Sequence, residues 1–249
     1  CIRRELDGRG FSELKECDNW ELRPGDRRYV IKNGSAIMAF IVGSGNPAEA
    51  GFRIISSHSD SPCFKIKPNA EIYGEGGMVS LNVEKYGGGI LYTWFDRPLS
   101  ISGRVMLRTA DPLNPECRLL DMRRPVAFIP HLAIHFNRAV NEGNPLSVQK
   151  DMKPVVGYFT PEEIERQKRE GGIVKMTVAK ELGVDVSDIL EYELCLYPAE
   201  PAALCGLNDE FFQSARIDDL SMAFASLEAL LTAADNKEIT PATRVMAVF

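Results

Sequence analysis

Strand and helix patterns alternate at both ends of this 249-residue chain, and a long stretch of short strands and turns separates the two ends. Near the start, apolar runs at 29–32 and 35–42 flank Asn33-Gly34, the strongest short signal for a β-hairpin. Near the end, Leu220, Phe224, Leu227 and Leu231 share the expected core-facing side of a helix predicted over 220–234, and 244–249 has the pattern of a buried strand. This combination excludes an all-α or all-β chain and predicts an α/β fold.

The middle of the chain has a different pattern. From about Ile66 to Ile129, alternating apolar and polar residues are bounded by glycine and proline, which is typical of short strands joined by turns. Thr160, Pro161 and Glu163 form the capping-box signature of a helix start. We therefore predict a central-sheet domain, residues 1–68 and 205–249, interrupted by a β-rich inserted domain, residues 69–204.

The two ends of the chain lead to a further expectation. The first residue is Cys1 rather than methionine, and the last segment, Arg244–Phe249, has the pattern of a buried strand. A domain rarely ends on an uncovered apolar strand. We expect the chain to be a segment of a longer protein, with an incomplete central-sheet domain.

Composition excludes several classes of protein. The chain has 29 basic and 35 acidic residues and a net charge of −6, which argues against a nucleic-acid partner. Its longest apolar run, Ala36–Val42, has seven residues, whereas a membrane-spanning helix needs ~20. The six cysteines lack CxxC spacing, so we expect reduced, buried thiols in a cytoplasmic protein. The phosphate-binding motifs GxxxxGK[ST] and GxGxxG are absent, as is the GxSxG motif of serine hydrolases.

Two polar side chains follow Gly51–Ser57, which has the pattern of a mostly buried strand. They are His58 and Asp60, at the strand end where ligands bind in open α/β sheets. One imidazole nitrogen can bind a metal while a carboxylate two residues away fixes the other nitrogen. A polar loop that merely caps the strand has the same pattern.

A second acidic pair opens the predicted helix at 220–234. Asp219 fits a helix-capping role, because acidic residues stabilise helix N-termini. Two adjacent carboxylates cannot both cap the helix, and Arg216 lies beside them, so Asp218 is the better candidate for a polar functional site.

The other two histidines lie four residues apart, His131 and His135, on a helix predicted over 131–141. This spacing can bind zinc, but Leu132 stands where a zincin has its glutamate, so that class is excluded. Structural roles are the alternative. The glycine-rich segment 86–89 and Trp94-Phe95-Asp96-Arg97 could form a binding loop, but turns, packed aromatics and an ion pair explain them better.

Four longer motifs occur in order along the chain: 57–68 (SHSDSPCFKIKP), 84–105 (EKYGGGILYTWFDRPLSISGRV), 129–138 (IPHLAIHFNR) and 215–220 (ARIDDL). With these motifs the chain resembles the aspartyl aminopeptidase family of co-catalytic zinc aminopeptidases over almost its whole length. The resemblance implies a phosphorylase/hydrolase-like catalytic domain interrupted by a β-rich dimerisation domain. It also implies a cytoplasmic enzyme whose homodimers build a larger oligomer, a dodecamer.

The resemblance assigns roles to four residues. His58 matches a zinc ligand, Asp60 matches the aspartate that orients this histidine, and Asp218 matches the carboxylate that bridges two Zn²⁺ ions. His135 matches a histidine that reaches a neighbouring subunit's active site and binds substrate there, while His131 stays structural. The implied reaction releases N-terminal residues, Asp or Glu by preference, from peptide substrates through a water activated by two zinc ions.

One departure from the family bears on activity. In the family, a Glu-Glu pair follows the strand that resembles Arg244–Phe249; one glutamate is the general base and the other binds zinc. An aspartate and a histidine ligand come later. Since these positions would lie beyond Phe249, we expect residues 1–249 alone to be inactive. The alternatives are an inactive fragment or assembly module of the family, and a related dizinc amide hydrolase acting on a non-peptide substrate.

Overall fold

The computed structural model describes residues 1–236 and 238–249. Within them the chain forms two compact units: unit 1 comprises Cys1–Ser61 and Arg216–Phe249, and unit 2 comprises Pro62–Ala215. Both units combine sheets and helices, so the predicted α/β class is confirmed. The boundaries differ from those predicted, 68/69 and 204/205. Strand β5 (Cys63–Tyr73) starts directly after the polar loop and joins the sheet of unit 2. The hairpin of β11 (Ala203–Cys205) and β12 (Phe211–Gln213) also belongs to unit 2.

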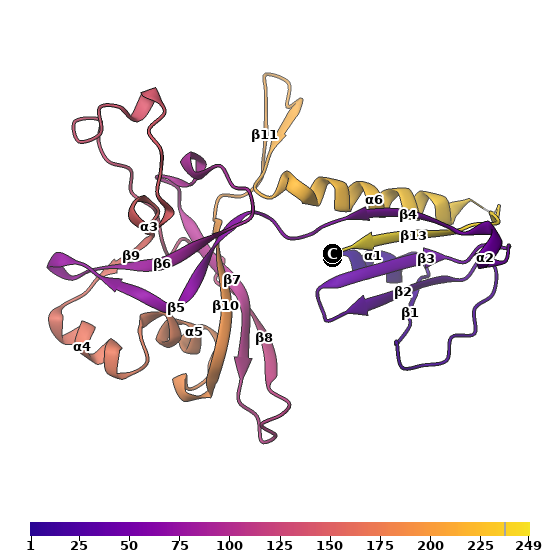
Figure 1. Cartoon of the computed structure of the whole chain (residues 1–249), viewed down its shortest axis with the longest axis horizontal. Coiled ribbons are helices and arrows are strands. Elements are labelled where there is room, and N and C mark those ends of the chain that lie inside the picture. The colour runs from indigo at the N-terminus through magenta and orange to yellow at the C-terminus, as the bar shows by residue number, and fades with distance from the viewer. Residues whose placement is uncertain (237) are drawn as a thin grey trace. The chain divides into compact units, whose positions relative to one another are not determined.

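Unit 1 is a five-stranded sheet in the order β1-β2-β3-β13-β4. Strand β13 lies antiparallel to β3 and parallel to β4, so the last strand of the chain sits between two early ones (Figure 1). The elements are α1 (Ile2–Gly8), β1 (Ser12–Glu13), β2 (Arg27–Lys32), β3 (Ala36–Ile41), α2 (Pro47–Ala50), β4 (Phe52–Ser57), α6 (Ile217–Asp235) and β13 (Thr243–Val248).

The hairpin prediction for unit 1 is confirmed. Strands β2 and β3 pair with Lys32 opposite Ala36. Asn33, Gly34 and Ser35 connect the paired positions, and Asn33 (φ 52°) and Gly34 (φ 68°) both adopt the left-handed conformation that asparagine and glycine favour in hairpin turns. Strands β2 and β3 are antiparallel. Strand β13 pairs with the other edge of β3, and its residues are mostly buried, as predicted.

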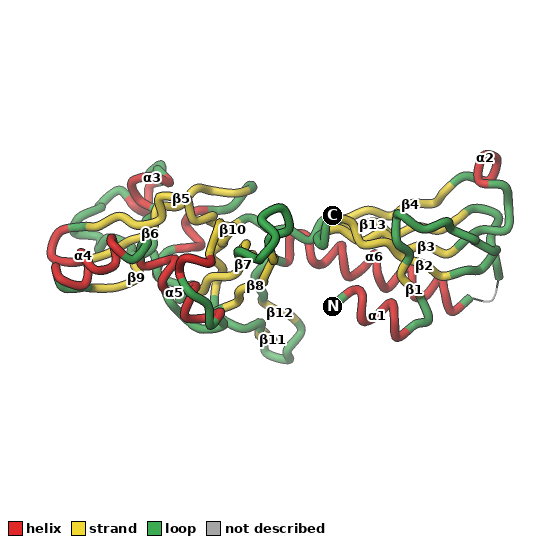
Figure 2. The backbone as a smooth tube through the Cα atoms, turned by 90° about the horizontal axis from the view of Figure 1, so that it is seen from below, coloured by secondary structure: helices red, strands yellow, loops and turns green. Residues whose placement is uncertain are grey.

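Helices α1 and α6 pack on the same face of the unit 1 sheet (Figure 2). Leu6, Tyr29 and Met246 lie in this core together with Leu227 and Leu231 of α6. The predicted helix at 220–234 is therefore confirmed. The expected core positions Leu220 and Phe224 are exposed, however, because the buried stripe of α6 consists of Ala223, Leu227, Leu230, Leu231 and Ala234.

Strand β4 was expected to be mostly buried, and this expectation is wrong. It is the edge strand of the sheet, and Phe52, Ile54 and Ile55 are exposed. In the described ranges, 1–236 and 238–249, the outer edge of β4 pairs with no other strand. Its apolar character marks a surface suited to contact with further protein.

Unit 2 is built around a six-stranded antiparallel sheet in the order β8-β7-β10-β5-β6-β9. The remaining elements are η1 (Glu75–Gly77), β6 (Met78–Tyr86), η2 (Leu91–Trp94), β7 (Leu99–Leu107), β8 (Glu116–Asp121), η3 (Val140–Glu142), α3 (Val148–Asp151), β9 (Val155–Tyr158), α4 (Pro161–Arg169), α5 (Ile173–Leu182), η4 (Val186–Asp188) and β10 (Ile189–Pro198).

The core of unit 2 lies between the sheet and α5. Phe64 of β5 is almost fully buried, and its ring meets the buried Trp94 edge-on at 4.9 Å between centroids. Leu194 and Leu196 of β10 belong to the same core. Helix α4 begins with the predicted capping box, in which Thr160 and Glu163 exchange side-chain and backbone hydrogen bonds.

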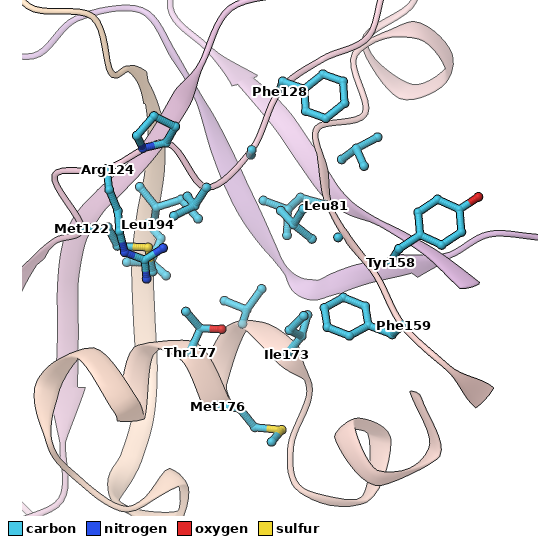
Figure 3. Close-up of a pocket in the computed structure, with 18 of the residues that line it drawn as sticks. Leu81, Met122, Arg124, Phe128, Tyr158, Phe159, Ile173, Met176, Thr177 and Leu194 are labelled. Atoms are coloured by element: carbon cyan, nitrogen blue, oxygen red, sulfur yellow. The ribbon is translucent and has the colours of Figure 1, made fainter. Parts of the chain in front are cut away.

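An open groove of about 1310 Å³ lies on unit 2. Figure 3 shows its apolar lining, with Phe128 and Tyr158 on one side and residues of α5 such as Met176 on the other. Arg124 lies at one end of the groove (Figure 3) and pairs with Glu181.

The helix predicted over 131–141 is wrong. Residues 131–139 form a loop with turns, and the short helix η3 is the sole helical element that overlaps the predicted range. His131 and His135 therefore do not lie on a helix face. The segment follows Pro130, and the backbone N–H of its first residue, His131, donates to Asp96, which lies outside the segment.

As expected, no disulfide links the six cysteines in the described part of the chain, but four are exposed and two are half-buried, so the expectation of buried thiols is wrong. Among the described residues, no helix is long and apolar enough to cross a membrane. The cytoplasmic location stays a prediction.

Candidate metal centre

The polar loop after β4 lies at the carboxyl ends of two parallel strands. Strands β4 and β13 end at this edge, and their ends are joined because Phe249 N–H donates to Ser57 and Ser59 N–H donates to Phe249. The loop also contacts the start of α6, since the Ser61 hydroxyl donates to the Asp218 carbonyl at 2.8 Å. This edge is where α/β sheets bind ligands.

His58 has a different partner on each ring nitrogen. Nδ1 lies 3.0 Å from Asp60 Oδ1 and 3.1 Å from the Asp60 carbonyl oxygen. Nε2 lies 3.7 Å from Asp218 Oδ1 and 3.7 Å from Asp219 Oδ2. His58, Asp218 and Asp219 each offer one ligand atom, and these atoms lie within 4.8 Å of one another.

The two aspartates have different surroundings. The Asp219 side chain is only 17% exposed, and its Oδ2 accepts a hydrogen bond from the backbone N–H of His58. The Asp218 side chain is 79% exposed and presents its carboxylate to the imidazole. Asp219 thus connects α6 to the loop, and Asp218 is free to bind a ligand. Neither residue has helical backbone angles.

Negative charge governs the titration of His58. Desolvation lowers the pKa of His58, but the hydrogen bond to the Asp60 carbonyl and the charges of Asp219 and Asp60 outweigh it, so the pKa lies above its ordinary value. A cation is favoured at this position. A proton and a metal ion would compete for Nε2.

The donor set fits zinc. One imidazole nitrogen and carboxylate oxygens are ligands that Zn²⁺ accepts. The Asp60 contact to Nδ1 leaves Nε2 as the ligand atom, an arrangement common in metal sites. Three donors in the described part of the chain are fewer than the four of a closed site, so these residues would hold an open site.

The structure brings together three of the four predicted site residues, His58, Asp60 and Asp218. His135 belongs to unit 2 and is not a member of this cluster. Sequence reasoning missed the part played by Asp219. Asp219 does lie in the first turn of α6, where an acidic residue stabilises the helix, but its carboxylate also accepts a hydrogen bond from the backbone N–H of His58, which is distant in the sequence. The adjacent acidic pair was a signal, but nothing local showed which carboxylate faces the loop.

An α/β sheet with nitrogen and oxygen donors converging at its carboxyl edge is a place where a protein can bind a metal ion. The chain belongs to the aminopeptidase I zinc metalloprotease (M18) family, whose sequence model matches residues 1–249. The family resemblance drawn from the four motifs is therefore confirmed.

Comparisons with individual relatives also place the chain in this family. A Clostridium acetobutylicum protein described as "Probable M18 family aminopeptidase 2" is 44% identical over 248 residues, which cover 100% of this chain and 55% of the relative. The matching chain in the cryo-EM structure of the Ape4 and Nbr1 complex is 32% identical, with a TM-score of 0.89. The match covers 100% of this chain and 50% of the other. The Saccharomyces mApe1 dodecamer is 28% identical, with a TM-score of 0.77, covering 100% and 55%. The chain thus spans about half the length of its relatives.

The contact between Asp60 and His58 gives a first prediction. Asp60→Asn removes the charge that holds Nδ1, and zinc affinity is expected to fall about 10- to 100-fold. Isothermal titration of the chain with zinc measures this change. Asp18→Asn, at an exposed position elsewhere in unit 1, serves as the control. An unchanged affinity in Asp60→Asn would contradict the orienting role.

Proposed function

We propose that the chain is part of a zinc aminopeptidase that releases N-terminal residues, acidic by preference, from peptides. One observation carries this proposal within the M18 family. Nε2 of His58 faces the exposed carboxylate of Asp218 while Asp60 holds Nδ1. Since the chain spans about half the length of its relatives, activity is assigned to the complete gene product.

His58 and Asp218 would hold the metal, and Asp60 would fix the ring. The Asp60 carboxylate would accept a hydrogen bond from Nδ1–H, so that the lone pair of Nε2 is available to a metal ion. Zinc supplies Lewis acidity that polarises the peptide carbonyl and activates water. A second zinc ion is implied by the family resemblance alone, and the exposed Asp218 carboxylate would be the group that both ions share.

The remaining groups of the site are expected outside residues 1–249. The resemblance places the general-base glutamate and further ligands after the position of Phe249. His135 is exposed, on a loop of unit 2, and we assign it the contact with substrate in a neighbouring subunit. The acidic preference rests on the family resemblance alone.

The test is an aminopeptidase assay of the complete gene product, with and without a chelator. Asp- and Glu-peptides are compared with a Leu-peptide, and N-acetyl-aspartate serves as the non-peptide amide. Zinc-dependent release of acidic residues supports the proposal. Hydrolysis of N-acetyl-aspartate alone, or no zinc-dependent hydrolysis, would overturn it. Residues 1–249 alone are expected to be inactive.

Assembly is proposed to use unit 2, with a second copy of the chain packed over its groove. The groove, about 1310 Å³, is larger than the ~300–1000 Å³ of small-molecule sites and is mainly apolar. Phe128 and Tyr158 on its rim are exposed (Figure 3). A related aminopeptidase is a dodecamer. A homodimer that builds a dodecamer is the proposed state.

Charge placed in this groove should prevent dimer formation. Phe128→Glu puts a carboxylate into the apolar contact, and we expect the mass in light scattering to fall to that of the monomer. Leu119→Glu, at an exposed position on β8, is the control. If Phe128→Glu keeps the wild-type mass, the groove is not the interface.

A further inference from the structure

A short segment of unit 2 contacts both ends of the loop that carries His135. The loop is His131–Asn144, which leads to α3, and the segment is Tyr92–Asp96, which begins in η2. We call the segment the clamp. From the sequence, packed aromatics and an ion pair of Asp96 with Arg97 or another partner were favoured over a binding loop. Arg97 does form such a pair, but with Glu200 rather than Asp96.

The first end of the loop is fixed at His131. The Phe95 ring stacks on its imidazole, with 4.4 Å between centroids and 20° between planes. Asp96 Oδ1 accepts a hydrogen bond from the backbone N–H of His131 at 2.9 Å. The backbone N–H of Asp96 donates to the Ile129 carbonyl at 2.9 Å, so the residues just before the loop are held by the same residue.

The second end is fixed at Asn144. The Tyr92 hydroxyl donates to the carbonyl of Asn144. The Tyr92 ring also lies edge-on to His131, with 6.4 Å between centroids. One side chain therefore touches both ends of the loop. Within the loop, the Asn144 side-chain amide donates to Asn137 Oδ1 at 3.3 Å.

Between these ends the loop has little packing of its own. Leu132, Ile134 and Phe136 are exposed, as is His135. A segment with few buried contacts takes its order from its attachments. The conformation of His135 thus depends on the contacts that hold His131 and Asn144.

We propose that Tyr92 and Asp96 are positioning residues that fix the two ends of the His131–Asn144 loop and so set the place of His135. This rests on the proposed substrate contact of His135. A group held in place before substrate arrives avoids an entropy cost in the reaction, and a misplacement of about 1 Å can lower the rate ~10²-fold.

Matched variants separate positioning from general stability. Tyr92→Phe keeps the ring and removes the hydroxyl bond to Asn144. Asp96→Gly removes the acceptor for His131, whereas Asp96→Asn keeps an acceptor oxygen. Asp96 has φ 55°, a conformation that asparagine and glycine both tolerate. Tyr73→Phe removes a hydroxyl elsewhere in unit 2 as a control.

The first readout is hydrogen exchange of the chain. Amides at 131–144 should exchange about 10-fold faster in Tyr92→Phe and Asp96→Gly, but at the wild-type rate in Asp96→Asn and Tyr73→Phe. The second readout is the complete gene product, where Tyr92→Phe and Asp96→Gly should lower kcat/KM about 10- to 100-fold without a change in Tm.

Two results would overturn the inference. One is unchanged loop exchange in Tyr92→Phe and Asp96→Gly. The other is faster exchange with unchanged kcat/KM in a protein whose His135→Ala variant is impaired. If His135→Ala retains full activity, the proposed contact of His135 fails instead. In that case, hydrogen exchange alone tests whether the clamp holds the loop. Faster exchange of amides 131–144 in the variants supports this role of the clamp, and unchanged exchange overturns it.

Discussion

Asp218→Asn is expected to abolish stable zinc binding. The substitution replaces the exposed carboxylate that faces Nε2 of His58 with a neutral amide of the same shape. Loss of an outer carboxylate partner costs about 10- to 100-fold in metal affinity, and loss of a direct ligand should cost more than 100-fold. In the complete gene product, peptidase activity should fall at least as far. Zinc titration and the peptide assay measure the two effects.

The matched control for this prediction is Asp219→Asn. Asp219 also lies 3.7 Å from Nε2, but its Oδ2 accepts from the His58 backbone. The amide oxygen of asparagine can keep that hydrogen bond. We therefore expect a smaller loss of zinc affinity than in Asp218→Asn. An equal or larger loss would mean that Asp219, rather than Asp218, is the main carboxylate ligand.

Phe64→Ala is expected to destabilise unit 2 by about 3–5 kcal/mol. Removal of a buried phenylalanine loses apolar burial and leaves a cavity. Phe64 is 1% exposed and packs edge-on against Trp94, so the cavity would lie inside the core. Urea unfolding monitored by tryptophan fluorescence gives the change in the free energy of unfolding.

Leu119→Ala is the control for this prediction. Leu119 is 82% exposed on β8, and its truncation should change the free energy of unfolding by less than about 0.5 kcal/mol. A loss below 1 kcal/mol in Phe64→Ala would contradict the described core.

Local signals predicted the elements whose geometry they determine. Asn33-Gly34 predicted a hairpin because both residues accept positive φ. The capping box at Thr160 and Glu163 predicted the start of α4, because its hydrogen bonds are local. The helix at 131–141 was mispredicted because the segment takes its shape from contacts with Tyr92, Phe95 and Asp96, which lie far away in the sequence.

Long-range packing also limits what the sequence shows about burial. The pattern of β4 looked buried, yet its position at the sheet edge exposes Ile54. At the candidate metal centre, the link between His58 and Asp60 is local and was predictable from spacing. The approach of Asp218 was anticipated only through family resemblance, because it depends on β13 pairing parallel to β4. The role of Asp219 required the structure.

The central claim is that His58 and Asp218 hold zinc, and an anomalous difference map at the zinc absorption edge tests it most directly. Crystals of the zinc-loaded protein should show a peak in contact with Nε2 of His58 and the carboxylate of Asp218. A map with no peak at His58, or with zinc only on the exposed cysteines, would contradict the account.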